Sequence, residues 1–199
     1  MIYAILGDRG DGKSAFATAT AFNEYMNNGA KIVCNYKLNF PPSPTGGKVI
    51  EKSLYEITKL PDDINDAILI LDEFHLIAPS RKIFGKSNER YIILVTQLRK
   101  RNITLFWLSQ RWMLVDKGIR DQTDFYIMMS NISDDFFIAE ICDRWTDAPL
   151  NTIEFDAKEF FKGKYYDTTE VITRGDEKLE SDEEVKKDAN SKRKGGRDA

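Results

Sequence analysis

Short apolar runs alternate with amphipathic segments along most of the chain. Five runs have the length and composition of strands and cover residues 2–6, 31–34, 67–71, 103–109 and 124–129. Apolar residues that recur every three or four positions predict helices over 13–28, 88–101 and 134–145. A β-hairpin is predicted over 152–172, with its turn at Lys162-Gly163. Strands that alternate with helices favour an α/β domain, in which helices flank a mostly parallel central sheet.

The pattern changes near Arg174. Beyond it the chain has no aromatic residue and is rich in Glu, Asp, Lys and Arg. Such a segment buries too little apolar surface to offset the entropy of ordering, so we expect residues 174–199 to form a charged, disordered tail. Residues 1–173 are expected to form one domain, because the chain of 199 residues has about the length of a single domain.

Composition narrows the class of protein. The chain is 42% hydrophobic and 31% charged, as is typical of globular proteins. A membrane-spanning helix needs about 20 apolar residues, and no stretch approaches this, so we expect no transmembrane segment. The two cysteines, Cys34 and Cys142, lack the spacing of a metal site or a disulfide framework. The cytoplasm is therefore the expected compartment.

The net charge of −3 hides an uneven distribution. Residues 80–120 carry ten basic and two acidic side chains, whereas residues 121–173 carry four basic and twelve acidic ones. Clustered positive charge indicates an anionic partner such as nucleic acid. Ordinary solvated helix faces can produce the same count, so charge alone leaves both interpretations open.

A phosphate-binding motif lies between the first predicted strand and the first predicted helix. Residues 7–14 match the pattern G-x-x-x-x-G-K-[ST] in full. Backbone N–H groups of such a loop cradle phosphates, Lys13 would contact the β- and γ-phosphates, and Ser14 would ligate Mg²⁺. We therefore predict a site for ATP and Mg²⁺. Its nucleotide-binding residues are Gly7, Asp8, Arg9, Gly10, Asp11, Gly12, Lys13, Ser14 and Ala15.

An acidic pair follows the apolar strand at 67–71. In P-loop enzymes an Asp at this place holds the Mg²⁺ shell, which predicts that role for Asp72. The adjacent Glu73 would accept a proton from the attacking water, which favours hydrolysis. The pair could instead form a helix N-cap. His75, the only histidine, would either pack or sense the γ-phosphate.

Further polar residues are candidates for the same site. Gln110 ends the strand at 103–109; if that strand lies between the two phosphate-site strands, Gln110 faces the γ-phosphate and senses hydrolysis. A surface glutamine is the alternative. An arginine supplied by a neighbouring subunit can stabilise the transition state. Arg120 is the first candidate for this role and Arg99 the next, and Arg101 and Arg111 remain open.

Taken together, these motifs resemble the FtsK–HerA superfamily of ring-forming P-loop motors. Within it they are most similar to small viral genome-packaging ATPases and to the ATPase domain of Zot-like filamentous-phage assembly proteins. The likeness covers about residues 1–170 and rests on four segments, 7–14, 72–75, 98–110 and 115–120. It implies a RecA-like (ASCE) domain with an extra strand between the two phosphate-site strands. It also implies a hexameric or pentameric ring and double-stranded DNA moving through its centre.

Three functions follow from these observations. The first is ATP-driven translocation of double-stranded DNA during viral genome packaging, in the host cytoplasm or the virion, with capsid or membrane-associated viral components as possible partners. We favour it because Zot-like proteins usually add a transmembrane segment and an outer domain, and this sequence shows neither. The second is a Zot-like assembly ATPase that does not move DNA. The third is a monomeric P-loop NTPase or kinase, against which Glu73 argues.

Overall fold

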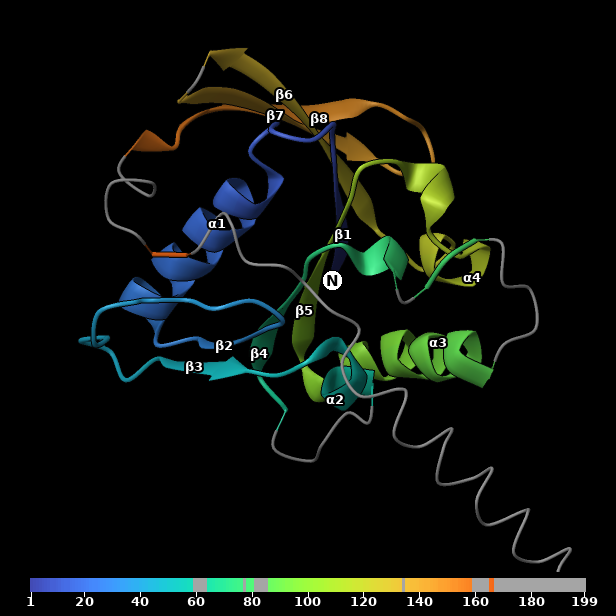
Figure 1. Ribbon diagram of the computed structural model, residues 1–199, viewed down its shortest axis with the longest axis horizontal. Helices are drawn as coiled ribbons and strands as arrows, with labels where there is room; N and C mark the ends of the chain where they lie inside the picture. The colour runs from blue at the N-terminus through green and yellow to red at the C-terminus, as the bar shows by residue number, and fades with distance from the viewer. Residues whose placement is uncertain (59–63, 77, 81–85, 134, 159–164, 167–199) are drawn as a thin grey trace, which may run out of the picture.

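The computed structural model describes residues 1–58, 64–76, 78–80, 86–133, 135–158 and 165–166 (Figure 1). These residues form an eight-stranded sheet in the order β3-β2-β4-β5-β1-β6-β7-β8. The strands are β1 (Ile2–Leu6), β2 (Lys31–Cys34), β3 (Lys48–Glu51), β4 (Ala67–Leu71), β5 (Ile103–Ser109), β6 (Phe125–Ser133), β7 (Phe136–Asp143) and β8 (Pro149–Asp156). The helices are α1 (Lys13–Asn28), α2 (Leu54–Thr58), α3 (Lys86–Leu98) and α4 (Lys117–Arg120), with short 3₁₀ turns η1 (Phe74–Leu76), η2 (Arg99–Arg101) and η3 (Trp112–Leu114).

The parallel part of the sheet runs from β3 to β6 and positions the predicted site. β5 pairs with β4 on one side and with β1 on the other, all in parallel. Leu6 at the end of β1 is level with Ser109, and Leu71 at the end of β4 is level with Trp107. The carboxyl ends of the three strands therefore meet at one edge. The predicted extra strand between the two phosphate-site strands is confirmed.

Helices cover both faces of the parallel strands (Figure 1). Helix α1 packs Phe16 and Tyr25 against one face, where Ile5 and Ile32 are fully buried. Helices α2, α3 and α4 pack against the other face around Trp107. Because the strands are buried on both sides, they consist of continuous apolar runs, as is typical of parallel sheets. The predicted α/β fold is confirmed.

The predicted helix over 134–145 is wrong. The described residues of this segment include β7, which pairs antiparallel with β6. Phe137 and Ala139 are buried on the side of α1, and Ile138 between them lies on the other face of the sheet. Phe137, Ile138 and Ile141 also match a helical spacing, so the period alone could not decide. The alternation of Phe137, Ala139 and Ile141 is the strand signal that the helical interpretation overlooked.

Three short elements, β3, α2 and α4, escaped the sequence analysis, and one prediction is tested only in part. β3 and α4 have four residues each and α2 has five, too few for a clear period. The first arm of the predicted hairpin is β8, which begins at Pro149 and pairs with β7. The turn at Lys162-Gly163 and the tail at 174–199 lie outside the described residues. No helix in the described part of the chain is long and apolar enough to cross a membrane.

Candidate nucleotide site

The phosphate loop joins β1 to α1 in the conformation that its glycines allow. Gly12 has a φ of 77°, in the left-handed region that a side chain rarely adopts. A Cβ atom there would lie 2.8 Å from the ring of Phe137 on β7. Gly12 is thus required both by the backbone angle and by the packing of β7 against the loop.

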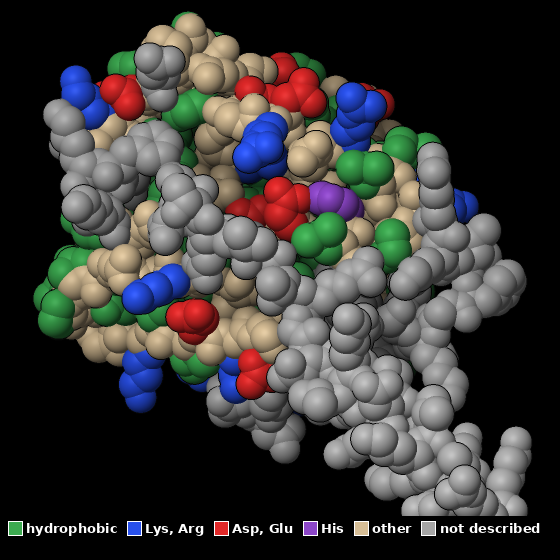
Figure 2. Space-filling view, in the orientation of Figure 1, with side chains coloured by type: hydrophobic (Ala, Val, Ile, Leu, Met, Phe, Trp, Pro, Cys, Tyr) green, Lys and Arg blue, Asp and Glu red, His purple; other side chains and the backbone are tan. Residues whose placement is uncertain are grey.

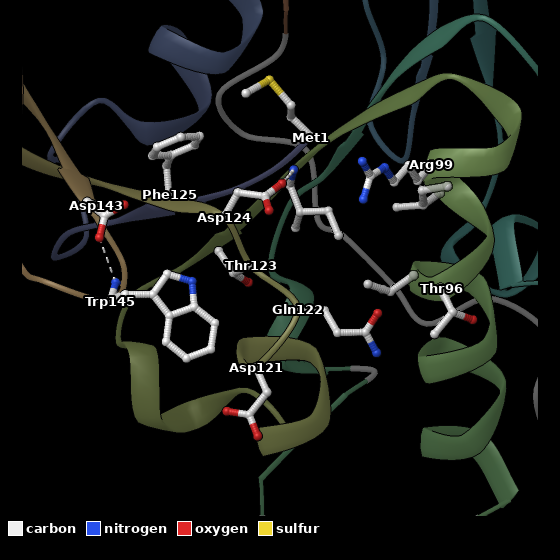
Figure 3. Close-up of a pocket in the computed structure, with 13 residues that line it drawn as sticks. Met1, Thr96, Arg99, Asp121, Gln122, Thr123, Asp124, Phe125, Asp143 and Trp145 are labelled. Atoms are coloured by element: carbon white, nitrogen blue, oxygen red, sulfur yellow. Dashed lines mark hydrogen bonds between the residues drawn. The ribbon is translucent and has the colours of Figure 1, made fainter.

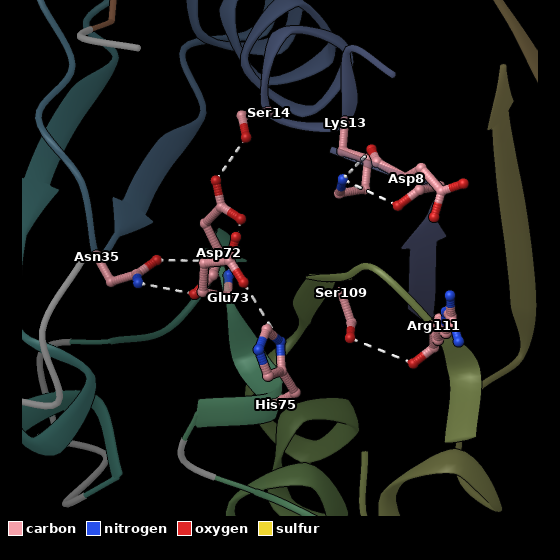
Figure 4. Close-up of polar contacts among 10 residues, drawn as sticks. Asp8, Lys13, Ser14, Asn35, Asp72, Glu73, His75, Ser109 and Arg111 are labelled. Atoms are coloured by element: carbon pink, nitrogen blue, oxygen red, sulfur yellow. Dashed lines mark hydrogen bonds and ion pairs between the residues drawn. The ribbon is translucent and has the colours of Figure 1, made fainter. Parts of the chain in front are cut away.

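The side chain of Lys13 folds back onto the phosphate loop (Figure 4). Its Nζ donates hydrogen bonds to the carbonyl oxygens of Gly7, at 3.0 Å, and Asp8, at 2.8 Å. The side chain is only 8% exposed, so its charge is held against the loop rather than in solvent. Asp11 closes the same turn, because its carboxylate accepts a hydrogen bond from the Asp8 N–H. Lys13 therefore lies against the phosphate loop, and its contact with phosphates stays a prediction.

The first turn of α1 is suited to an anion. Its N-cap is Gly12, which offers no side-chain hydrogen bond, and the turn contains no acidic residue. The first N–H groups of a helix have no partner within the helix and carry partial positive charge. Phosphate oxygens are the usual acceptors at such a terminus. Ala15 is buried beneath this turn, whereas Arg9 in the loop is exposed.

The phosphate loop and the acidic pair meet at one contact. Ser14 Oγ donates a hydrogen bond to Asp72 Oδ2 at 2.5 Å, across the ends of α1 and β4 (Figure 4). A hydroxyl and a carboxylate are ligands that Mg²⁺ takes together with phosphate oxygens and water. No cluster of three or more acidic, His or Cys residues that could hold a metal exists among the described residues. The donor set therefore fits Mg²⁺ that is bound jointly with a nucleotide.

Asn35 fixes the backbone of Asp72, a contact that the sequence analysis missed. Its Nδ2 donates to the Asp72 carbonyl at 3.0 Å, and its Oδ1 accepts from the Asp72 N–H at 2.7 Å. Asn35 directly follows β2, the strand beside β4. A polar residue immediately after an apolar strand was the available signal. Paired hydrogen bonds of this kind hold Asp72 toward Ser14.

Glu73 lies at the same edge and contacts His75. Its backbone has a φ of 50°, and its N–H donates to Asp72 Oδ1 at 2.7 Å. The Glu73 carboxylate oxygen Oε2 lies 3.3 Å from His75 Nδ1. Figure 2 shows the single histidine, in purple, beside acidic side chains near the centre of this face. The N-cap alternative for the pair fails, because only a 3₁₀ turn of three residues follows it.

A buried tyrosine network lies behind Asp72. Tyr36 is 2% exposed, and its hydroxyl shares a 2.9 Å hydrogen bond with Thr18 of α1. Tyr166 forms a bridge to Leu38 and packs edge-on against Tyr36. Burial, and then the nearby Asp72 carboxylate, raise the pKa of Tyr166 well above its usual value. The chain near residue 166 therefore returns to the predicted metal site.

The other predicted site residues are less closely associated with the loop. Gln110 is exposed directly after β5, between the ends of β4 and β1, as predicted, and its sensing role remains a prediction. Arg111 lies at the same edge (Figure 4). Arg120 donates to the Val115 carbonyl at 3.0 Å and lies over the Trp112 ring, 6.0 Å from its centroid. The side-chain contacts of Arg120 are thus with the segment 112–115 of its own chain.

Arg99 lies at the opposite edge of the sheet. It lines a cavity of about 630 Å³ near the start of β1, together with Trp145 (Figure 3). The acidic side chains of this cavity are engaged: Asp124 accepts from the Ile2 N–H at 2.8 Å, and Asp143 accepts from the Trp145 N–H at 3.0 Å. The structure therefore does not bring Arg99 to the phosphate loop of its own subunit.

Solved structures with this fold include viral packaging ATPases. The N-terminal domain of zonular occludens toxin from Neisseria meningitidis matches with a TM-score of 0.60 at 20% identity, covering 83% of this chain and 98% of that one. The genome packaging NTPase B204 of Sulfolobus turreted icosahedral virus 2, in complex with ATP-gammaS, matches with a TM-score of 0.53 at 13% identity, covering 78% and 96%. The DNA-packaging ATPase B204 of Sulfolobus turreted icosahedral virus matches with a TM-score of 0.52 at 14% identity, covering 78% and 96%. At these identities the likeness establishes the fold.

The sequence itself identifies the family. No curated protein matches the chain. The model of the zonular occludens toxin (Zot) family matches residues 1–133, which contain the phosphate loop, the acidic pair and Gln110. This match covers two thirds of the 199 residues. The chain therefore belongs to the Zot family and has the P-loop NTPase fold.

Proposed function

We propose that the protein is a Mg²⁺-dependent ATPase. The observation that carries this proposal is the 2.5 Å contact of Ser14 with Asp72, because it joins the phosphate loop to the acidic pair. Glu73 is the next residue and lies at the same edge. The B204 structure in complex with ATP-gammaS supports the choice of nucleotide.

Each residue has a distinct part in the proposed hydrolysis. The loop amides and Lys13 bind the phosphates, and Ser14 and Asp72 would hold Mg²⁺, which would supply positive charge to the phosphate oxygens. Glu73 accepts a proton as the water oxygen bonds to the γ-phosphorus. The bond from that phosphorus to the bridging oxygen breaks, and ADP leaves. Lys13 stabilises the charge that develops on the leaving oxygen.

Two substitutions test this activity. General-base catalysis contributes about 10²–10⁴-fold, so Glu73→Gln should reduce kcat by that factor while nucleotide still binds. Lys13→Ala should abolish nucleotide binding, because it removes the cation at the phosphates. Glu51→Gln, at an exposed position on β3, is the matched control and should hydrolyse ATP like the wild type. Full turnover by Glu73→Gln would contradict the proposal.

We further propose that the ATPase acts as a homo-oligomeric ring that translocates double-stranded DNA, as in viral genome packaging. Lys100, Arg111 and Lys117 are exposed and belong to residues 80–120, the segment with ten basic side chains. They would contact DNA phosphates. Exposed Glu140 and Glu154 lie in the acidic region and would complement those cations on a neighbouring subunit. The genome packaging NTPase with the same fold supports the DNA-moving alternative. Gln110 would sense hydrolysis, and Arg120, or next Arg99, would act on the neighbour's nucleotide.

Membership of the Zot family favours a second candidate, an assembly ATPase that does not move DNA. Hydrolysis measured against protein concentration, with and without linear double-stranded DNA at low salt, separates the candidates. Turnover per subunit that rises with concentration and again with DNA supports the motor. A rise with concentration alone supports the assembly ATPase. Constant turnover, independent of both, would leave a monomeric enzyme.

A further inference from the structure

His75 is a polar residue beside the acidic pair that the proposed mechanism does not use. It belongs to η1, which begins one residue after Glu73. Its Nδ1 is buried and makes no hydrogen bond to the described residues. Glu73 Oε2 lies 3.3 Å from His75 Nδ1, which is within ion-pair distance. The two groups are not aligned as a hydrogen bond requires. A small rotation of either side chain would align the two groups.

The residue of η1 that is anchored in the core is the neighbour of His75. This neighbour, Phe74, is fully buried and lies 6.1 Å from Trp107, between ring centroids, so Phe74 anchors η1 in the core. The His75 side chain is 20% exposed and points toward the acidic edge (Figure 4). Phe74 therefore points into the core, whereas His75 points toward Glu73.

Glu73 is a residue whose side chain needs such a partner. Its φ of 50° lies in the left-handed region, which a residue other than glycine adopts mainly where its surroundings impose it. The Glu73 N–H is bonded to Asp72, so the backbone is fixed. The carboxylate, however, stands at the end of a flexible side chain and is 35% exposed. Among the described residues, no hydrogen bond holds that carboxylate.

We propose that His75 is a positioning residue for Glu73, which rests on the proposed ATP hydrolysis. A neutral imidazole with its proton on Nδ1 donates to Glu73 Oε2 and orients the carboxylate. The other oxygen, Oε1, is then directed at the attacking water and accepts its proton. Misplacing a reacting group by about 1 Å can cost about 10²-fold in rate, so such orientation is catalytically significant.

Three substitutions of His75 test the proposal. His75→Leu removes the donor at similar volume and should lower kcat by about 10–100-fold, with KM and nucleotide affinity unchanged. His75→Asn places an amide N–H near the position of Nδ1 and should restore most of the activity. His75→Gln places its amide near Nε2 and should remain slow. Thermal unfolding of each variant shows whether the turn is still folded.

The double variant gives the deciding result. Because His75 acts only through Glu73, adding His75→Leu to Glu73→Gln should cause no further loss of kcat. An equal loss in both backgrounds, or a folded His75→Asn protein as slow as His75→Leu, would overturn the positioning role. Full activity of His75→Leu would overturn it too. A wild-type protein without ATPase activity would overturn the proposed function and this inference together.

Discussion

The parallel strands and the antiparallel strands of this sheet differ in what they contribute to the site. The residues that carry the proposed phosphate and metal contacts follow parallel strands: the phosphate loop follows β1, and Asp72, held by Asn35 after β2, follows β4. The strand β6, which pairs in parallel with β1 and antiparallel with β7, and the antiparallel strands β7 and β8 supply no such residue among those described. They pack against the phosphate loop instead, as Phe137 does beside Gly12. Chemistry and mechanical support are thus assigned to different parts of one sheet.

The support is visible in the packing of β7 and β8. The ring of Phe137 on β7 lies beside Gly12 of the phosphate loop. The centroids of the Phe137 ring and the Phe155 ring on β8 are 6.4 Å apart. Phe155 in turn packs edge-on against Phe16 of α1, at 5.8 Å. These aromatic rings connect β7 and β8 to Gly12 at the end of the phosphate loop and to Phe16 in the first turn of α1. The site therefore depends on residues that take no part in its chemistry.

The largest expected effect comes from breaking this support. Phe137→Ala removes a ring that is 2% exposed and should lower the free energy of unfolding by about 3–5 kcal/mol. It should also weaken nucleotide binding, because Gly12 loses its neighbour. Phe136→Ala, one residue earlier at a position 41% exposed, is the control and should cost less than about 1 kcal/mol. Urea unfolding and nucleotide titration measure both, and equal losses in the two variants would contradict the assignment.

A smaller effect is expected from the loop side of the same contact. Gly12→Ala should cost about 1–3 kcal/mol, since it adds a clash with Phe137 to the strain of a positive φ. Gly10→Ala provides the comparison, because Gly10 has a φ of 93° but open space where the Cβ would lie. The difference between the two variants isolates the clash. Placing Gly12→Ala in a Phe137→Ala background should remove that difference, and its persistence would exclude the contact as the cause.

The two regions also differ in how well the sequence predicts them. β1, β4 and β5 are buried on both faces, so their apolar runs are uninterrupted and their ends fall at the expected residues. β7 has one face that no described helix covers, so buried and exposed residues alternate. Five of its first six residues are apolar, which blurs the alternation and allowed a helical interpretation. Burial on one face only is what made this segment ambiguous.

The site could be predicted in its parts and less well in its arrangement. The phosphate loop and the acidic pair are local motifs, and their residues lie as predicted. The contacts of Asn35 and Tyr166 with Asp72 or its surroundings join segments that are far apart along the chain, so no local pattern indicates them. The arginine supplied by a neighbour stays a prediction. Its position depends on a second subunit, which no single chain specifies.

A hydrogen bond at the boundary between the two regions allows a milder test. Trp107 of β5 donates its Nε1–H to Thr123 Oγ1 at 3.1 Å, just before β6 begins. Thr123→Val leaves this buried N–H without its acceptor and should lower the free energy of unfolding by about 1–2 kcal/mol. Thr123→Ser keeps the acceptor and is the matched control. If the valine variant were as stable as the serine variant, the boundary would not depend on this bond.

The smallest effect concerns pH and the tyrosines behind Asp72. Burial raises the pKa of Tyr166 and of Tyr36 above the ordinary value of 10. Above pH 10 the unfolded chain therefore releases tyrosine protons that the folded chain retains, so stability falls as pH rises. The slope is at most about 1.4 kcal/mol per pH unit for each group.

Tyr166→Phe removes one of these two contributions. Below pH 9 the variant and the wild type should show similar pH dependence, because both tyrosines are protonated in the folded and unfolded states. From pH 10 to 11 the wild type should lose more of its free energy of unfolding than Tyr166→Phe, as urea unfolding at each pH would show. Parallel curves through this range would mean that the Tyr166 hydroxyl ionises as readily in the folded protein as in the unfolded chain. The segment at 165–166 would then not pack against the parallel strands as tightly as its contacts with Leu38 and Tyr36 indicate.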